Sequence, residues 1–483
     1  PPQRLGEGER EEKVPVVIGQ TGERVDMVVI GGGPGGYSAA IRSAQLGQKV
    51  VLIERAAIGG VCLNHGCVPS KALLSAAQLA DRARRGAAMG IDARVDVDLV
   101  RLQAWKRGIV DRLTTGVRGL LDRWGIRVVH GAARLASERR VAVDLGEDVA
   151  FFEFQSAVLA TGSRAATAGG LSPEQALELD ALPARIVVAG AGSVGVELAT
   201  AFARLGQDVT LLSPDGVLLP ELDEPLLGRA VAGGLRRLGV TLVLSCTIER
   251  IESTSLSYRT KDGPAQIDDV LVVDASRRVP NTDDLGLADA GLRLLEDGTV
   301  RVDTQQRTTM HHIFAVGDIT PGPLLAHRAI AEGRVAAEVA AGLASAMDPS
   351  VIPVVCFTEP EVAAVGLSES AARGQGHAVS SARFPFAASG RALTLEEPEG
   401  FLQVVSDLDS GRLTGVQIAG TGATELAGEA ALAIEMGATL DDLALTLHPH
   451  PTIGEAFVET AELALGRPRH IFRTPPPRDD RAR

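Results

Sequence analysis

The stretch VDMVVIGGGPGG (residues 25–36) joins an apolar run to a glycine-rich turn, and it decides the fold predicted for this chain. The apolar run predicts a buried strand, residues 37–42 predict a helix, and residues 50–54 predict a second strand. Strand, turn, helix and strand in this order form a βαβ unit, which indicates an α/β protein.

The glycines of this turn have the spacing of a dinucleotide-binding site. Gly31 makes the tight turn, Gly33 lets the backbone approach a pyrophosphate, and Gly36 lets helix and strand pack closely. Glu54 follows Gly31 at the distance expected for an acid that binds the hydroxyl groups of a ribose. The unit therefore predicts one bound dinucleotide.

The same pattern recurs from residue 186. An apolar strand-like run leads to three glycines, a helix-like segment and a second strand at 209–213. The glycines of this second turn are Gly190, Gly192 and Gly195. The position that corresponds to Glu54 is Ser213 rather than an acid. Two such units predict two dinucleotides, one held permanently and the other used as a substrate.

A pair of cysteines follows the first unit, in the segment GGVCLNHGCVPSK (residues 59–71). The glycines before Cys62 predict that this cysteine opens a helix, whose N-terminus favours the reactive thiolate. Cys67 lies near enough in sequence to reach Cys62 if the helix begins irregularly. Lys71 stands one turn after Cys67, where its charge would stabilise a thiolate. A thiol pair beside a nucleotide indicates redox chemistry.

A second reactive segment is LHPHPTIGE (residues 447–455). His450 stands between two prolines, which hold it in a rigid extended stretch. Glu455 could accept a hydrogen bond from the imidazole, orient the ring and raise its basicity. A helix-capping acid beside an ordinary histidine is the alternative reading, and His448 is predicted to be structural.

The composition narrows the class of protein. A chain of 483 residues with 45% hydrophobic residues and 54 glycines predicts a globular α/β protein of three or four domains. The net charge of −13 and the 3% of aromatic residues argue against nucleic acid, and the charge also argues against an anionic membrane surface. No apolar run is long enough to span a bilayer and no signal peptide is recognised, so a cytoplasmic location is predicted.

The cysteine content argues against a metal site. Four cysteines fit a reducing cytosol, where a disulfide is more often catalytic than structural. Zinc would need two further ligands near Cys62 and Cys67. The remaining cysteines, Cys246 and Cys356, each lie alone in an apolar run and are predicted to be buried thiols, so no metal is expected.

These segments together resemble the flavoprotein disulfide oxidoreductases that carry two dinucleotide folds. The resemblance rests on the cysteine segment, both glycine turns, ATG (160–162), GD (317–318) and HPT (450–452) with Glu455. LLAH (324–327), FPFA (384–387) and GRAL (390–393) make it most similar to the dihydrolipoamide dehydrogenase family. That family implies a homodimer that binds FAD and NAD, oxidises dihydrolipoamide on a lipoylated E2 or H-protein, and reduces NAD⁺.

The resemblance also implies domains and residue roles. It predicts an FAD domain (25–163 and 284–348), an NAD domain (164–283) and an interface domain (349–472), flanked by a polar extension (1–24) and a disordered tail (473–483). Cys62 would exchange with the substrate, Cys67 would lie against the flavin, and His450 of the partner subunit would be the base, oriented by Glu455. The positions implied for FAD are Gly31, Gly33, Gly36, Glu54, Lys71, Gly131, Thr161, Gly162, Asp318 and Ala326. Those implied for NAD are Gly190, Gly192, Gly195, Glu197, Ser213 and Arg277, with Glu197 pairing with Lys71 near the reactive edge of the flavin.

Two positions depart from the family pattern. Ser213 replaces an acid common in NAD-linked members, but the acidic residues Glu221, Asp223 and Glu224 follow it and would repel a 2′-phosphate, which favours NAD over NADP. Arg277 stands where the family usually has glycine, and its larger side chain puts in question how closely the nicotinamide half of NAD fits there.

Three other functions fit part of this sequence. A glutathione reductase shares the main motifs but usually has lysine at Ser70 and an arginine cluster for NADPH. A mercuric reductase needs a C-terminal cysteine pair, which this chain lacks. A weakly catalytic scaffold or NAD(H)-sensing subunit is supported only by Ser213 and Arg277.

Overall fold

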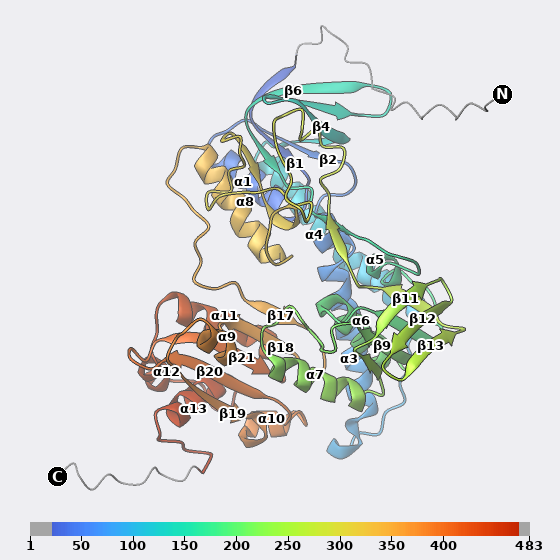
Figure 1. The fold of residues 1–483 in the computed structure, drawn as a ribbon, viewed down its shortest axis with the longest axis vertical. Helices are drawn as coiled ribbons and strands as arrows, with labels where there is room; N and C mark the ends of the chain where they lie inside the picture. Colours follow the sequence, from blue (N-terminus) through green and yellow to red (C-terminus); the bar gives the residue numbers. More distant parts are fainter. Residues whose placement is uncertain (1–21, 473–483) are drawn as a thin grey trace, which may run out of the picture.

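The computed structural model describes residues 22–472. The predicted tail and nearly all of the polar extension therefore lie outside the described residues. The described chain forms two βαβ-based units and a C-terminal unit with an antiparallel sheet (Figure 1). This is the predicted α/β class with an α+β C-terminal domain. The exact domain boundaries remain a prediction.

The first unit is built on a seven-stranded sheet. Its order is β3-β2-β1-β6-β5-β4, and β16 pairs with the C-terminal half of β6. Strands β1, β2, β3, β6 and β16 run parallel, whereas β4 and β5 form an antiparallel extension. The strands are β1 (Glu23–Ile30), β2 (Val50–Glu54), β3 (Arg127–His130), β4 (Ala132–Ser137), β5 (Arg140–Asp144), β6 (Val149–Leu159) and β16 (Ile313–Ala315).

Helices α1 (Pro34–Gln45) and α8 (Ala326–Ala340) pack side by side in this unit. A Cβ at Gly333 of α8 would overlap the carbonyl oxygen of Gly35 in α1, so glycine permits this close approach. The short helix η2 (Gly317–Ile319) follows β16 at the predicted Gly-Asp turn.

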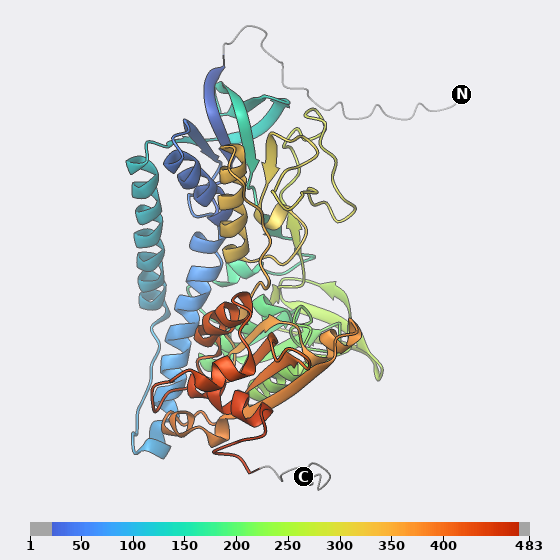
Figure 2. The same cartoon turned by 90° about the vertical axis from the view of Figure 1, so that its left-hand side faces the viewer.

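The amphipathic pattern of residues 70–123 predicts one helical segment, but the structure divides it. The five-residue α2 (Gly60–Asn64) precedes α3 (Cys67–Arg84), η1 (Gly86–Met89) follows, and a loop leads to α4 (Leu99–Arg123). The side chain of Asp98 caps α4 by accepting a hydrogen bond from the Arg101 amide at 3.0 Å. Both long helices run along the long axis of the molecule (Figure 2). Helix α3 thereby reaches from the first unit to the second.

The second unit has a parallel sheet of order β10-β9-β8-β14 and a separate antiparallel sheet, β11-β12-β13. The pair β7-β15 connects this unit to the first. The strands are β7 (Ser163–Ala165), β8 (Arg185–Ala189), β9 (Asp208–Ser213), β10 (Thr241–Leu244), β11 (Thr247–Ile251), β12 (Ser255–Thr260), β13 (Gly263–Asp268), β14 (Leu271–Asp274) and β15 (Arg278–Pro280). The helices are α5 (Pro173–Ala176), α6 (Ser193–Arg204) and α7 (Pro225–Arg237).

The C-terminal unit has an antiparallel sheet of order β17-β18-β21-β20-β19. Its strands are β17 (Val354–Cys356), β18 (Val362–Gly366), β19 (Val379–Pro385), β20 (Phe401–Asp407) and β21 (Leu413–Ala419). Its helices are α9 (Glu369–Gly374), η3 (Phe386–Ala388), α10 (Gly390–Thr394), α11 (Ala423–Glu435), α12 (Leu440–Leu445) and α13 (Glu455–Ala464). The sequence pattern predicts helices at 423–437 and 454–465, and α11 and α13 confirm them.

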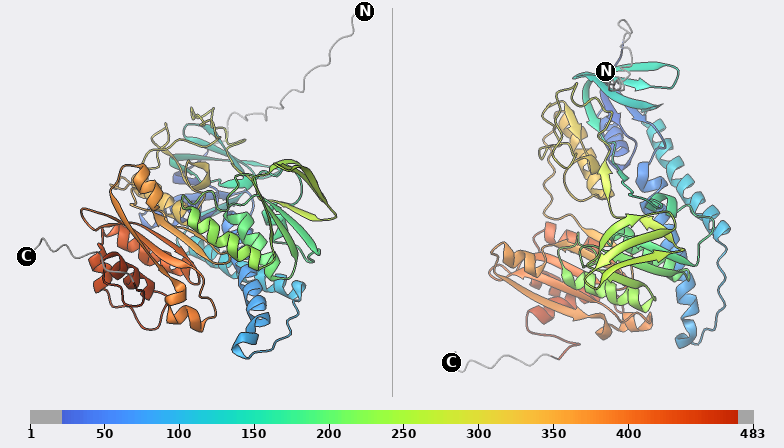
Figure 3. Two further views of the ribbon diagram at one scale, coloured as in Figure 1. Left: turned by 60° about the horizontal axis from the view of Figure 1, so that its bottom comes forward. Right: turned by 45° about the vertical axis from the view of Figure 1, so that its right-hand side comes forward.

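A shared hydrophobic core joins the C-terminal unit to the second unit. Cys356, Val362 and Ala419 belong to the same buried cluster as apolar residues of α3, α6 and α7. Figure 3 shows α7 beside the strands of the C-terminal sheet. Among residues 22–472, no helix combines the length and apolar character needed to cross a membrane.

Candidate active site

A cavity of about 350 Å³ lies where the first glycine turn, the cysteine helix α3 and the start of α6 meet. Its walls come from segments that are far apart in the sequence. The predicted residues that line it are Gly31, Gly33, Glu54, Cys62, Cys67, Lys71, Thr161, Gly162, Glu197, Asp318 and Ala326. The fold therefore gathers most of the positions implied for FAD, both cysteines and the Lys71–Glu197 pair around one space.

The first glycine turn fits the pyrophosphate of a dinucleotide. Gly33 is the N-cap of α1, with φ −71° and ψ −177°, and no side chain caps the helix there. The atom nearest to a Cβ built on Gly33 is the Cα of Gly60 at 3.9 Å, so the helix N-terminus faces open space. A Cβ on Gly36 would instead overlap the carbonyl oxygen of Gly31. Free amides at an open helix N-terminus bind phosphate well.

Glu54 is held at the end of β2 by the backbone. Its carboxylate accepts hydrogen bonds from the amides of Gly32 at 2.6 Å and Ala56 at 2.7 Å. Each carboxylate oxygen has a further lone pair for a ribose hydroxyl. Gly131 does not line the cavity; its amide donates to the carbonyl oxygen of Glu54 at 3.1 Å.

Asp318 is held by a polar chain across the junction of the two units. The Ser163 hydroxyl donates to Asp318 Oδ2 at 2.6 Å, and Arg278 Nε donates to the Ser163 hydroxyl at 2.9 Å. Arg278 also pairs with Glu174 at 2.7 Å. Burial alone would raise the pKa of Glu174, but the hydrogen bond from Arg278 holds it below its usual value. Asp318 is thus fixed at the wall of the cavity.

The two cysteines differ in their acidity. The hydrogen bond donated by the Cys62 thiol and the charge of Lys71 outweigh burial and lower the pKa of Cys67 to about 7. The same hydrogen bond, followed by burial, raises the pKa of Cys62. Both cysteines are free thiols in this structure. Cys67 is therefore the thiolate of the reduced pair.

The prediction that Cys62 opens a helix is confirmed only for the short α2. Cys62 is the third residue of the short α2, whereas Cys67 is the first residue of the 18-residue α3. The break at His65 and Gly66 starts a new helix at Cys67, so the second cysteine takes the position that favours negative charge.

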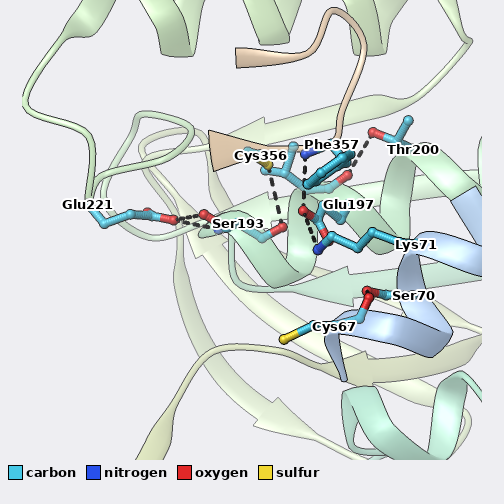
Figure 4. A network of polar contacts seen from close by, with 10 residues as sticks. Cys67, Ser70, Lys71, Ser193, Glu197, Thr200, Glu221, Cys356 and Phe357 are labelled. Atoms are coloured by element: carbon cyan, nitrogen blue, oxygen red, sulfur yellow. Dashed lines mark hydrogen bonds and ion pairs between the residues drawn. The ribbon is translucent and has the colours of Figure 1, made fainter. Parts of the chain in front are cut away.

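Lys71 and Glu197 form an ion pair between α3 and α6. Lys71 Nζ lies 3.0 and 2.8 Å from the two carboxylate oxygens of Glu197 and 4.8 Å from the centre of the Phe357 ring. The Phe357 amide donates to Glu197 at 3.1 Å. Burial acts to lower the pKa of Lys71, but the carboxylate of Glu197 outweighs it and raises the pKa. Lys71 is consequently a permanent cation one turn after Cys67 (Figure 4).

The second glycine turn repeats the geometry of the first. Gly192 is the N-cap of α6 with φ −72° and ψ 177°, and a Cβ on Gly195 would overlap the carbonyl oxygen of Gly190. Ser213 is fully buried, and its hydroxyl donates to the Val217 carbonyl at 2.5 Å.

The three acidic residues after Ser213 were expected to repel a 2′-phosphate at this position, but two of them bond to helix N-termini instead. Glu221 accepts a hydrogen bond from the amide of Ser193, and Glu224 caps α7 through the amide of Leu226 at 2.9 Å. The loop between β9 and α7 thus directs these two carboxylates to helix N-termini, and only Asp223 is exposed without such a role. Arg277 is exposed and its backbone does not adopt a positive φ, so this position does not require glycine.

His450 and Glu455 are paired as predicted by sequence. The Nδ1 atom of His450 lies 2.9 Å from Glu455 Oε1, and the Thr452 amide donates to Oε2 at 2.9 Å. Burial acts to raise the pKa of Glu455, but these hydrogen bonds hold it below its usual value. The His450 side chain is 77% exposed, and neither residue lines the cavity of its own chain.

His448 is structural, as predicted. Its ring is stacked on Phe457, with centroids 6.3 Å apart, and its Nε2 atom lies 2.8 Å from Glu429. It therefore fixes the loop that presents His450.

Sequence reasoning missed four residues around the site: Ser163, Glu174, Arg278 and Phe357. The first three form the chain that holds Asp318, and the fourth supports the Lys71–Glu197 pair. Position in the motif could have pointed to Ser163, which directly follows ATG (160–162), and to Arg278, next to Arg277. Nothing in the local sequence marks Glu174 or Phe357.

Comparison with known proteins supports this arrangement. Residues 25–333 match the model of the pyridine nucleotide-disulphide oxidoreductase family, and residues 352–461 match its dimerisation domain. The chain belongs to this family. It is a flavoprotein oxidoreductase that uses FAD and NAD(H), and its dimerisation domain supports a homodimer.

Relatives match nearly the whole chain. The chain is 42% identical over 470 residues to the dihydrolipoyl dehydrogenase of Geobacillus stearothermophilus and 41% identical over 473 residues to that of Halobacterium salinarum. Each match covers 95% of this chain and 100% of the relative. Among solved structures, LpdA from Mycobacterium tuberculosis is similar with a TM-score of 0.84 at 26% identity, covering 91% of this chain and 99% of that one.

Proposed function

We propose that this protein is a dihydrolipoyl dehydrogenase, which oxidises dihydrolipoamide to lipoamide and reduces NAD⁺ to NADH. The observation that carries the proposal is the thiol pair in the cavity, with a Cys67 thiolate at the start of α3 and Lys71 one turn later. Full-length relatives of the same printed name support this choice of substrate.

The cysteines perform the sulfur chemistry. In the oxidised enzyme they form a disulfide, and a thiolate of the substrate attacks the Cys62 sulfur, which releases Cys67 as a thiolate. The second thiol of the substrate then attacks the mixed disulfide, which releases lipoamide and leaves Cys62 as a thiol. Two electrons pass from the dithiol substrate to the cysteine pair, and the low pKa of Cys67 makes it the better leaving group.

His450 accepts the proton that the substrate thiol loses. Because His450 does not line the cavity of its own chain, the partner subunit's His450 would serve each site of the homodimer. Glu455 holds the Nδ1 side of the ring, which leaves Nε2 free for the proton. Dimerisation would therefore be required for activity.

The residues of the cavity fit FAD. Gly33 and the N-terminus of α1 would hold its pyrophosphate, Glu54 the adenosine ribose and Asp318 the ribityl chain. When bound, FAD links the two-electron chemistry of the cysteines to that of NAD⁺. Lys71 stays protonated and balances the charge of the Cys67 thiolate, while Glu197 keeps the ammonium group in place.

The protein partner would be a lipoylated E2 or H-protein, in a cytoplasmic 2-oxo acid dehydrogenase or glycine cleavage complex. NAD rather than NADP is proposed as the nucleotide, because no arginine cluster follows Ser213.

A steady-state assay of the purified holoenzyme tests the proposal. Dihydrolipoamide is the donor, and NAD⁺ and NADP⁺ are offered in parallel. Rapid formation of NADH, abolished in Cys67→Ser and kept in Cys246→Ser, is the expected result. Cys246 is a suitable control because it is buried in the second unit and does not line the cavity.

Two results would contradict the proposal. If dihydrolipoamide does not bleach the flavin, then the substrate is a different disulfide or dithiol. If it bleaches the flavin but neither nucleotide is reduced, then the second glycine turn does not support turnover.

A further inference from the structure

Glu221 places a carboxylate at the N-terminus of α6. Its Oε1 atom accepts a hydrogen bond from the Ser193 amide at 2.6 Å, and the Ser193 hydroxyl donates to the same oxygen. Figure 4 shows Glu221 and Ser193 in the same view as the Lys71–Glu197 pair and Cys67. The first amide of α6 is therefore already bound to an anion that belongs to the protein.

This carboxylate lies in the space that Gly192 leaves open. A Cβ built on Gly192 would have Glu221 Oε2 and Oε1 as its nearest atoms, at 3.5 and 3.6 Å. In a dinucleotide fold, the absence of a side chain at this glycine lets the pyrophosphate approach the backbone. Glu221 thus occupies the position at which the pyrophosphate of a nucleotide would bind.

The first dinucleotide fold provides an internal comparison. Gly33 and Gly192 are N-caps with nearly identical dihedral angles, φ −71° and ψ −177° against φ −72° and ψ 177°. No carboxylate lies within 4 Å of a Cβ built on Gly33, where the nearest atom is the Cα of Gly60 at 3.9 Å; Glu54 bonds instead to the amide of Gly32, before the N-cap. The two sites share their backbone geometry, but only at the second does a carboxylate lie beside the N-cap glycine and bond to the first residue of the helix.

The loop that carries Glu221 is anchored in the core, whereas the Glu221 side chain is exposed and bonds to Ser193. The Leu219 amide donates to the carbonyl oxygen of Ala191 at 2.8 Å, and both Leu218 and Leu219 are buried in the core. Glu221 itself is exposed. Its side chain can therefore turn away from Ser193 without any movement of the backbone.

We propose that Glu221 is an intrinsic competitor of the nicotinamide nucleotide, which must displace its carboxylate before the pyrophosphate can bind to α6. This inference rests on the proposed function, because it assumes that the second fold binds NAD(H). Two anions cannot share the same amide, and the displaced carboxylate still repels the pyrophosphate from nearby. Glu221 would therefore weaken the binding of NAD⁺ and NADH and favour release of the product.

Isothermal titration of NAD⁺ into the oxidised holoenzyme tests this inference. Glu221→Gln removes the charge and keeps the size of the side chain, so the dissociation constant is expected to fall by about tenfold, the typical worth of a charge-assisted hydrogen bond. Glu221→Ala is expected to tighten binding as well. Asp223→Asn is the matched control, because it makes the same change in net charge from an exposed position in the same loop. It is expected to change the dissociation constant by no more than about twofold.

The outcomes separate the two proposals. NAD⁺ binding that is unchanged or weaker in Glu221→Gln, or equally tightened in Asp223→Asn, would overturn the role of Glu221 while leaving the proposed function intact. Absence of NAD⁺ binding in both wild type and Glu221→Gln would overturn both. Bleaching of the flavin by dihydrolipoamide does not require NAD⁺ binding to the second dinucleotide fold. It should be the same in all variants and serves as the control that the cysteine and flavin site is intact.

Discussion

Lys71 Nζ lies 3.0 and 2.8 Å from the two carboxylate oxygens of Glu197, and this ion pair joins the cysteine helix α3 to α6 of the nucleotide fold. This ion pair keeps a positive charge one turn after Cys67. It also ties the helix of the thiol pair to α6, whose N-cap is Gly192. This ion pair therefore connects the cysteine pair, which would react with the dithiol, to the fold that would bind NAD⁺.

The Cys67 thiolate should depend on pH and on Lys71. Because the pKa of Cys67 is lowered to about 7, the thiolate of the reduced enzyme forms as pH rises through 7 and is lost below it. Alkylation of the reduced enzyme by iodoacetamide should follow this profile. In Lys71→Met the midpoint should move to higher pH and the thiolate fraction at pH 7 should fall by about fivefold or more, since a nearby opposite charge typically changes the ionisation constant by about tenfold or more.

Mass spectrometry of the alkylated peptide distinguishes Cys67 from Cys62, whose pKa is raised. Arg82→Met, a change further along the same helix, should leave the profile unchanged. Equal alkylation of both cysteines over the whole pH range would contradict the assignment of the thiolate to Cys67.

Loss of His450 should impair the dithiol reaction alone. In His450→Gln the oxidation of dihydrolipoamide should slow by about 10²–10⁴-fold, the usual contribution of a general base. In Glu455→Gln the ring keeps a hydrogen-bond partner but loses the negative charge beside it, so a smaller decrease is expected. Steady-state rates with dihydrolipoamide measure both effects.

Reduction of an artificial electron acceptor by NADH is the control for these two variants, because it does not use the thiol substrate. It should be nearly unaffected. A parallel loss of both activities would instead indicate damage to the dimer or to flavin binding.

Arg277→Gly should have little effect on the enzyme. Arg277 is exposed and its φ is not positive, so a change to glycine relieves no backbone strain and removes only an exposed side chain. The rate constant and the KM for NAD⁺ should remain within about twofold of wild type, as is usual for surface substitutions. A large increase in turnover would show that Arg277 obstructs the nicotinamide half and would favour the interpretation of a weakly catalytic protein.

Two adjacent glycines in α7 should respond in opposite ways to alanine. A Cβ at Gly234 would overlap the carbonyl oxygen of Glu359 in the C-terminal unit, so Gly234→Ala should lower the free energy of unfolding by about 1–3 kcal/mol. A Cβ at Gly233 would meet only the side chain of Arg237 at 3.6 Å, so Gly233→Ala should be neutral or stabilise the helix by up to about 1 kcal/mol. Thermal unfolding of the two holoenzymes measures the difference, and equal effects would contradict the close packing of α7 against the C-terminal unit.

Local patterns were sufficient to predict the two dinucleotide folds. The glycine spacings of both turns, the apolar runs before them and the pairing of His450 with Glu455 all depend on residues within about one βαβ unit or one loop. Their geometry is set by short-range backbone constraints, so the sequence by itself predicted it.

The breaks within a helical region were harder to predict. A continuous amphipathic pattern suggested one segment at about 70–123, but α3 ends at Arg84 and α4 begins only at Leu99. A separate turn at His65 and Gly66 starts α3 at Cys67 instead of continuing α2, which the local pattern did not reveal. The acidity of the two thiols follows from their mutual hydrogen bond, from burial and from Lys71, so it depends on the folded structure.

The sequence by itself determined the class of fold, the two nucleotide turns and the identity of the reactive cysteines, because each is encoded in a short contiguous pattern. Only the tertiary structure decided that Arg278 and Ser163 hold Asp318 and that Glu221 reaches Ser193. These contacts join residues that are from 28 to 155 positions apart in the chain. Such pairings depend on how the sheets and helices pack, and no local periodicity records them.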